Sequence, residues 1–211
     1  IGLANLNSII SSELKVMKNC GIGTGCFPDT KYKDLNGIEN SVKLDQDNSF
    51  TKMILADGST VALKNWDQSC SMHWGDISGM SNVCGMIGVD INGFKSPNKY
   101  GEDYFGFIIT KNGIVPMGSA IQTAYTFGDF CNKDSKNTIY GNGIACTAWT
   151  IYNENTDYKN HTNLSWNGNK IESPTEVKNH GNCGNGIGKG GSIGSGYGNG
   201  NGNTCYGNKN K

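Results

Sequence analysis

The sequence predicts an α+β domain in which an N-terminal amphipathic helix packs on an antiparallel β-sheet. Three observations support this class: a helically spaced apolar stripe near the N-terminus, two tight-turn signals between apolar segments, and eight cysteines spread along the chain. A chain of 211 residues can form one domain with a substantial core. We expect this domain at residues 1–178 and a Gly/Asn-rich tail at residues 179–211.

The predicted helix covers about residues 3–19. Its apolar side chains recur at spacings of three and four residues, which places them on one helical face: Leu3, Leu6, Ile10, Leu14 and Met17. The helix is expected to end near Gly21, because glycine readily takes the left-handed conformation that closes a helix. Of the stripe, Leu6, Ile10, Leu14 and Met17 are assigned to packing on the sheet.

Two hairpins are predicted from the dipeptides Asp57-Gly58 and Asn112-Gly113, which are typical of two-residue turns. The first joins residues 52–56 to 59–63, and the second joins residues 104–110 to 114–117. In the second hairpin, Phe105, Phe107 and Ile109 alternate, so we expect them to place one face on a core. The apolar run 83–91 predicts a buried strand. For residues 144–152 the pattern leaves helix and strand open.

The cysteines indicate an exported, disulfide-bonded protein. Their number is even and their spacing is wide, which is typical of a disulfide framework outside the cytosol; they are Cys20, Cys26, Cys70, Cys84, Cys131, Cys146, Cys183 and Cys205. Pairing in chain order would close short loops, but eight cysteines allow 105 pairings. The sequence contains no apolar run long enough to span a membrane, so we expect a targeting segment to have been removed.

Charge and composition exclude several partners. Lysine supplies all 18 basic side chains, which balance 18 acidic ones, and arginine is absent. Because arginine supplies the planar fork that reads phosphates and guanine edges, nucleic-acid recognition is not expected. The chain also lacks a polybasic run that would bind a membrane surface. The tail has 12 glycines in its last 33 residues and is expected to be disordered unless its two cysteines close it.

Oxygen-bearing side chains gather between residues 89 and 107 and suggest a calcium site. Hard divalent cations take six to eight oxygen ligands from carboxylates, amides and backbone carbonyls, and the candidate ligands here are Asp90, Asn92, Asn98, Glu102 and Asp103. The alternative is a loop made rigid by Asx turns, in which Asp90 and Asn92 bond their own backbone. Calcium is the one cofactor expected.

The segment DINGFKSPNKYGEDYFGF at residues 90–107, followed by NGIVPMGS, resembles the headgroup of type IV pilin-like and type II secretion pseudopilin-like proteins. These proteins carry a D-x-N-G-x-K-x-P-N-x-x-G-x-D-x-F block. Residues 53–58, residues 146–149 and Lys18-Asn19-Cys20 resemble other parts of the same headgroup. The resemblance covers about residues 1–158 and leaves the Gly-rich tail unexplained.

The resemblance implies that the predicted helix is the second half of a pilin's long N-terminal helix. The apolar first half, which anchors such proteins in a membrane and forms the filament core, is not in this sequence, so membrane contact is expected only through that segment. The implied function is that of a pilin, minor pilin or pseudopilin, a non-enzymatic structural subunit for adhesion or secretion. Its expected partners are copies of itself, other pilin subunits and host or surface ligands. It would be anchored in the inner membrane, facing the periplasm, before it enters an extracellular filament.

Two alternatives remain open. The chain could be a secreted adhesin module that binds carbohydrate or protein through Trp66, Trp74 and Trp166 and its Asn-rich loops. It could also be a cysteine hydrolase, because Cys70 lies close to His73 and could form a nucleophilic pair with it. We favour the structural subunit over both, and an even number of cysteines in an exported protein argues against a free thiol at Cys70.

Overall fold

The computed structural model describes residue 10 and residues 12–41, 43–74, 81–119, 125–135, 141–161 and 164. The chain divides into two compact units, residues 1–177 and residues 178–211, and the second unit lies outside the described residues. The strands of the first unit are β1 (Val16–Gly21), β2 (Thr51–Leu55), β3 (Thr60–Asn65), β4 (Val83–Asp90), β5 (Tyr104–Thr110) and β6 (Gly113–Pro116). Its named helical segments are η2 (Leu44–Gln46), α2 (Phe127–Phe130), α3 (Cys146–Asn153) and η4 (Asp157–Lys159).

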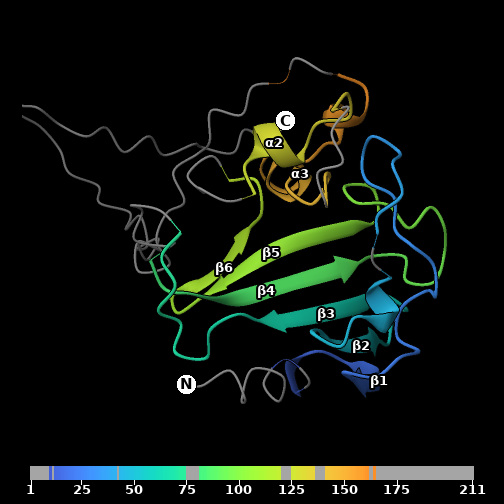
Figure 1. Cartoon of the computed structure of the whole chain (residues 1–211), viewed down its shortest axis with the longest axis vertical. Helices are drawn as coiled ribbons and strands as arrows, with labels where there is room; N and C mark the ends of the chain where they lie inside the picture. The colour runs from blue at the N-terminus through green and yellow to red at the C-terminus, as the bar shows by residue number, and fades with distance from the viewer. Residues whose placement is uncertain are drawn as a thin grey trace, which may run out of the picture. The chain divides into compact units, whose positions relative to one another are not determined.

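The six strands form one antiparallel sheet in which each strand pairs with the next along the chain (Figure 1). Both predicted hairpins are confirmed. In the first, Ile54 pairs with Thr60 across the Asp57-Gly58 turn, and in the second, Ile109 pairs with Ile114. The predicted buried strand is β4, which lies between β3 and β5. The stretch that the pattern left open is helical from Cys146, as α3.

The prediction of an α+β domain built on an N-terminal helix at residues 3–19 is wrong. Glu13 is the last helical residue of this stretch, and from Val16 the chain runs as β1 along the edge of the sheet, with Val16 opposite Leu55 and Asn19 opposite Met53. Pairing with β2 satisfies the backbone groups that a helix would have bonded internally, and the Cys20–Cys26 disulfide holds the end of β1. Tertiary pairing therefore overrides the local helical spacing.

The side chains that were assigned to helix packing have different environments. Met17 lies on β1 and is 65% exposed, and Leu14 is 38% exposed. Ile10 is half-buried and packs against buried side chains of the sheet. Leu6 lies outside the described residues. Within the described part of the chain, Ile10 is the one of these four side chains that packs against the buried cluster of the sheet.

The two faces of the sheet carry separate apolar clusters. The inner face bears the larger one, which includes Ala62, Met86 and Ile108 and is completed by side chains from the chain between β1 and β2, such as Phe27 and Tyr32. Helix α3 contacts β5 and β6. The outer face bears the second cluster: Met53, Val61, Leu63, Cys70, Cys84, Ile87 and Ile109.

Strand β5 shows how both faces become apolar. Ile109 is buried on the outer face, as the alternation predicts, but Phe105 and Phe107 are only half-buried. The fully buried Tyr104 and Ile108 point to the inner face instead. The Tyr104 ring crosses β4 at Gly88, where a Cβ atom would collide with it, so a glycine is required there by packing.

Candidate functional site

The connection from β4 to β5 holds four of the five predicted calcium ligands in one hydrogen-bond network. Asp90, the last residue of β4, is completely buried. Its carboxylate accepts hydrogen bonds from the hydroxyl of Tyr32, from Asn92 N at 3.1 Å and from Gly93 N at 2.8 Å. The two backbone donors follow within three residues, which is the geometry of an Asx turn.

Asp103 closes the other end of this connection. It is 2% exposed, and its carboxylate accepts hydrogen bonds from Asn98 N at 2.8 Å, Lys99 N at 2.6 Å and Asn92 Nδ2 at 3.1 Å. The Asn92 side chain thus links the two ends of the segment. The resulting loop is fixed by carboxylates that bond nearby backbone, as the Asx-turn alternative predicts.

Glu102, the fifth predicted ligand, stands apart from this network. Its carboxylate forms an ion pair with Lys99 Nζ at 2.6 Å, and both side chains are partly exposed. The sequence pattern could not separate Glu102 from the others, because spacing along a loop does not say which side chains turn inward. The structure therefore brings together Asp90, Asn92, Asn98 and Asp103 only.

Burial sets the electrostatics of Asp90. Loss of solvation raises its pKa to about 6, with the hydrogen bond from Tyr32 opposing the rise and the charge of Asp103 adding to it. Burial, followed by the charge of Asp90, raises the pKa of Tyr32 far above its ordinary value. Tyr32 therefore remains a hydrogen-bond donor at any physiological pH, and Asp90 titrates close to neutrality.

Two buried oxygen atoms of this loop suit a cation. Asn92 Oδ1 and Asn98 Oδ1 are buried and have no hydrogen-bond partner, which costs free energy unless something else binds them. All four oxygens of Asp90 and Asp103, by contrast, already accept hydrogen bonds. Within the described residues, no group of three or more His, Cys, Asp or Glu side chains could hold a metal ion. Calcium stays a prediction, with the two amide oxygens as the atoms that fit it best.

Three disulfides form between cysteines that are consecutive in the sequence, which confirms the predicted framework in the described residues. They join Cys20 to Cys26, Cys70 to Cys84 and Cys131 to Cys146. Each therefore closes a short loop. The prediction for Cys183 and Cys205 falls outside the described residues.

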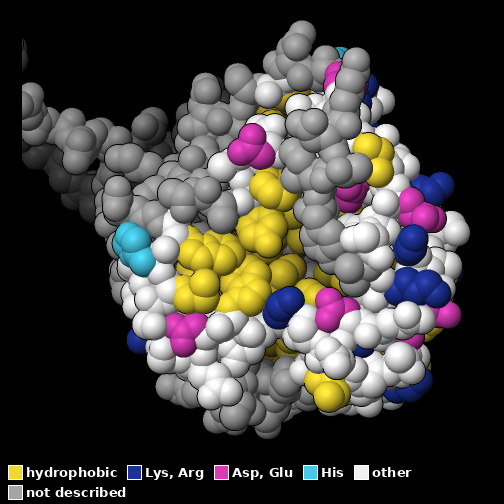
Figure 2. Space-filling model, viewed as in Figure 1, with side chains coloured by type: hydrophobic (Ala, Val, Ile, Leu, Met, Phe, Trp, Pro, Cys, Tyr) yellow, Lys and Arg dark blue, Asp and Glu magenta, His cyan; other side chains and the backbone are white. Residues whose placement is uncertain are grey.

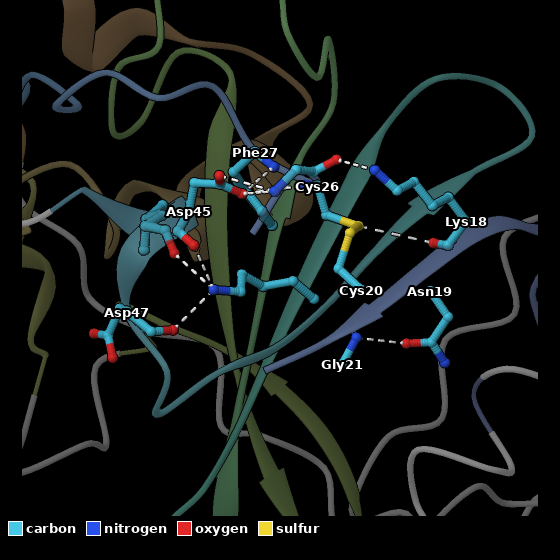
Figure 3. The surroundings of a disulfide bond; sticks show 11 residues. Lys18, Asn19, Cys20, Gly21, Cys26, Phe27, Asp45 and Asp47 are labelled. Carbon is cyan, nitrogen blue, oxygen red and sulfur yellow. Dashed lines mark hydrogen bonds between the residues drawn. A yellow bond between two sulfur atoms is a disulfide. The ribbon is translucent and has the colours of Figure 1, made fainter. Parts of the chain in front are cut away.

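The Cys20–Cys26 disulfide lies beside an anchor that the sequence did not reveal (Figure 3). The carboxylate of Asp45 accepts hydrogen bonds from three successive backbone N–H groups at Gly25, Cys26 and Phe27, at 2.8 to 3.1 Å. The fully buried Lys52 donates to the carbonyl oxygens of Asp45 and two neighbours, the shortest at 2.6 Å. These contacts fix the chain between β1 and β2 onto the inner face. Because the Asp45 contacts connect residues 18 to 20 apart in the sequence, no short sequence pattern predicts them.

The outer face of the sheet is hollowed. A depression of about 360 Å³, here called the outer groove, is lined by apolar side chains and one carboxylate: Ile10, Glu13, Leu14, Leu55, Val61, Ile87, Val89, Phe107 and Ile114. Ile114 is 59% exposed at one edge. The groove thus extends across strands β2 to β6 and presents hydrocarbon to whatever lies against it.

The structure argues against the cysteine hydrolase alternative, because its proposed nucleophile, Cys70, is in a disulfide. Cys70 is bonded to Cys84, so it has no thiolate with which to attack a substrate. His73 is exposed and lies next to Trp74, in a loop whose aromatic side chains pack on the inner face.

No known protein family, curated protein or solved structure matches the chain. Among the residues described, no helix is long and apolar enough to cross a membrane.

Proposed function

We propose that the chain is an exported structural subunit that assembles into a cell-surface filament or secretion pseudopilus through its outer groove. The observation that carries this proposal is the groove itself. The groove lies between the sheet and the segment before β1 and is lined by eight apolar side chains and one carboxylate, and an open apolar depression of this kind is typical of an interaction surface.

The occupant we propose is an apolar segment of a neighbouring subunit. The groove offers little to a polar ligand, since Glu13 is the only charged side chain among the described residues that line it. Apolar contact stabilises association by about 25 cal/mol per Å² of area removed from water. The whole chain has a formal net charge of zero, so copies of it do not repel one another through their net charge.

Two other features support a structural subunit. The block at residues 90–107, which resembles the pilin-like headgroup, forms a loop whose shape is fixed by Asp90 and Asp103. Three short-range disulfides lower the entropy of the unfolded chain, by about 2–4 kcal/mol each in stability. Both features suit a domain that must keep its shape outside the cell.

The test is a filament-shearing assay on cells that produce the complete protein. Ile114→Lys places a charge at the edge of the outer groove, where the native side chain is 59% exposed, so folding should be little affected. Ile151→Lys is the matched control, because Ile151 is 47% exposed on α3 and does not line the groove.

We expect the wild-type and Ile151→Lys proteins in the sheared filament fraction and the Ile114→Lys protein only in the cell fraction. Circular dichroism of the purified variants should show equal folding. Recovery of Ile114→Lys in filaments at the wild-type level, or the absence of any sheared assembly of the wild type, would refute the proposal.

A further inference from the structure

A row of aromatic side chains, here called the aromatic platform, lies on the inner face away from the outer groove. The ring centroids of Trp66 and Trp74 are 4.6 Å apart, those of Trp74 and Tyr125 are 5.9 Å apart, and those of Tyr125 and Phe130 are 5.0 Å apart. All four rings are half-buried and pack against the inner core. Figure 2 shows apolar side chains gathered in a hollow where Figure 1 draws β4, β5 and β6, with charged side chains at the margin.

The loop that carries the two tryptophans is held at several points to the start of β4. Trp66 N and Asp67 N both donate to Cys84 O at 2.9 Å, and Val83 N donates to Met72 O at 3.0 Å. Between these bonds, the Cys70–Cys84 disulfide ties the middle of the loop to the same strand. A surface loop held in this way positions its aromatic rings before any ligand arrives, which lowers the entropic cost of binding.

Asp67 adds an internal cap to the same loop. Its carboxylate accepts hydrogen bonds from the N–H and hydroxyl groups of Ser69, at 2.9 and 2.6 Å, and of Ser71, both at 2.6 Å. These bonds hold the pKa of Asp67 far below its usual range. The cap therefore persists over the whole physiological pH range, and the loop keeps one shape.

The platform has polar tips as well as apolar faces. Within the described residues, neither the indole N–H of Trp66 nor the hydroxyl of Tyr125 makes a hydrogen bond with another residue. Burial raises the pKa of Tyr125, so its hydroxyl stays protonated and can donate. Half-buried Trp and Tyr rings with available polar tips are suited to ligands that have an apolar face and hydroxyl groups at its rim.

We propose that the aromatic platform of Trp66, Trp74 and Tyr125 binds a neutral glycan, with the C–H face of a pyranose stacked on the rings. The hydroxyl groups of such a sugar can both accept from the Trp66 N–H and exchange hydrogen bonds with the Tyr125 hydroxyl. No charged side chain belongs to the platform, so a neutral sugar fits it better than a sialylated or sulfated one. This activity goes beyond filament assembly, because it uses the opposite face of the sheet and does not depend on the outer groove.

The experiment is a glycan array followed by calorimetric titration of the best neutral hit, using the full 211-residue chain. Trp74→Ala and Trp66→Ala each remove one stacking ring, whereas Phe94→Ala is the matched control, an exposed aromatic residue in the β4–β5 connection. Thermal melting of each variant checks that it folds. Loss of one ring should weaken binding about 10- to 100-fold, by comparison with the stacking of bases on aromatic side chains, and Phe94→Ala should bind like the wild type.

Tyr125→Phe provides a second variant that keeps the packing and removes only the hydroxyl group. It should weaken sugar binding while leaving the melting temperature unchanged. The proposal is overturned if the wild type binds no neutral glycan, if binding survives both tryptophan substitutions, or if proline-rich peptides bind the platform and sugars do not. None of these results would bear on the filament-shearing assay, so the two proposals fail separately.

Discussion

The inner and outer faces of the sheet are both apolar and both bury side chains, but within the described residues the outer face also carries an open groove. On the inner face, Ile108 is completely buried under side chains contributed by other parts of the chain. On the outer face, Ile114 of the neighbouring strand lines an open groove and is 59% exposed. A sequence of alternating residues cannot distinguish these two situations. We propose that the larger inner cluster provides most of the stability of the domain and that the open part of the outer face contacts a neighbouring subunit.

The largest expected effect is a difference in the free energy of unfolding between two isoleucine substitutions, one on each face of the sheet. Ile108→Ala should lower the free energy of unfolding by about 2–5 kcal/mol, because it leaves a cavity in a close-packed core. Ile114→Ala should change it by less than about 0.5 kcal/mol, because that side chain is already mostly in solvent. Urea denaturation measures both. Equal losses would mean that the outer face is covered in the isolated chain.

The Cys70–Cys84 disulfide links the loop that carries Trp66 and Trp74 to strand β4, which contributes side chains to both faces of the sheet. Replacing both cysteines by serine should cost about 3 kcal/mol, as expected for a closed loop of about 15 residues. Sugar binding should be lost in this variant even under conditions where it remains folded, since the Trp66–Trp74 loop loses its central attachment. The Cys20–Cys26 pair is the control: its double serine variant should be destabilised but should bind sugar normally.

Buried carboxylates on the inner side predict a stability that depends on pH. Burial raises the pKa of both Asp34 and Asp90 to about 6. A folded-state pKa above the unfolded value of about 3.8 means that the folded chain binds more protons, so these groups make the domain less stable as pH rises from 4 through 6. The loss should be at most about 3 kcal/mol for each group, as two pKa units imply.

The Asp90→Asn variant measures how much Asp90 contributes to the pH dependence of stability. It should flatten the fall in stability between pH 4 and pH 7 without abolishing it, because Asp34 still titrates. Chemical denaturation at a series of pH values gives the comparison. A wild-type stability that rises steadily over this range would contradict the assignment.

Calcium should produce the smallest shift if it binds the Asp90–Asp103 loop. A cation bound to Asn92 Oδ1 and Asn98 Oδ1 stabilises the folded state according to its affinity and concentration, so the melting temperature should rise in calcium relative to EDTA. The rise should be larger at pH 7 than at pH 5, because Asp90 is ionised at the higher pH. Asn98→Ala should remove the rise. Identical melting curves in calcium and EDTA would leave the Asx-turn network as the whole explanation of the loop.

The sequence predicts the two hairpins because their turns depend on residues that are adjacent in the chain. The Asp57-Gly58 and Asn112-Gly113 turns determine their hairpins because few other dipeptides take that backbone shape. The N-terminal helix was predicted wrongly at residues 14–19, where a helical spacing of Leu14 and Met17 competes with the pairing of β1 to β2. That pairing joins residues more than 30 positions apart, and no pattern within a short window contains it.

For the candidate sites too, contacts within one loop could be predicted from the sequence and contacts between distant segments could not. Asp90, Asn92, Asn98 and Asp103 lie within one loop, so their clustering could be predicted, but the outward turn of Glu102 to Lys99 could not. The sequence drew attention to Trp66 and Trp74 as aromatic residues. It offered no reason to place Tyr125 beside them, because their contact depends on how distant segments pack on the inner face.

The most direct test of assembly through the outer groove is thiol labelling at position 114. In an Ile114→Cys variant, a maleimide should label the introduced thiol rapidly in the isolated chain and at least about tenfold more slowly in the assembled filament. An Ile151→Cys variant is the control, and its introduced thiol should react at the same rate in both states. Protection at position 114 already in the isolated chain would show that the groove is covered before assembly. That result, or equal labelling at position 114 in both states, would contradict the proposal that the outer face is an assembly surface.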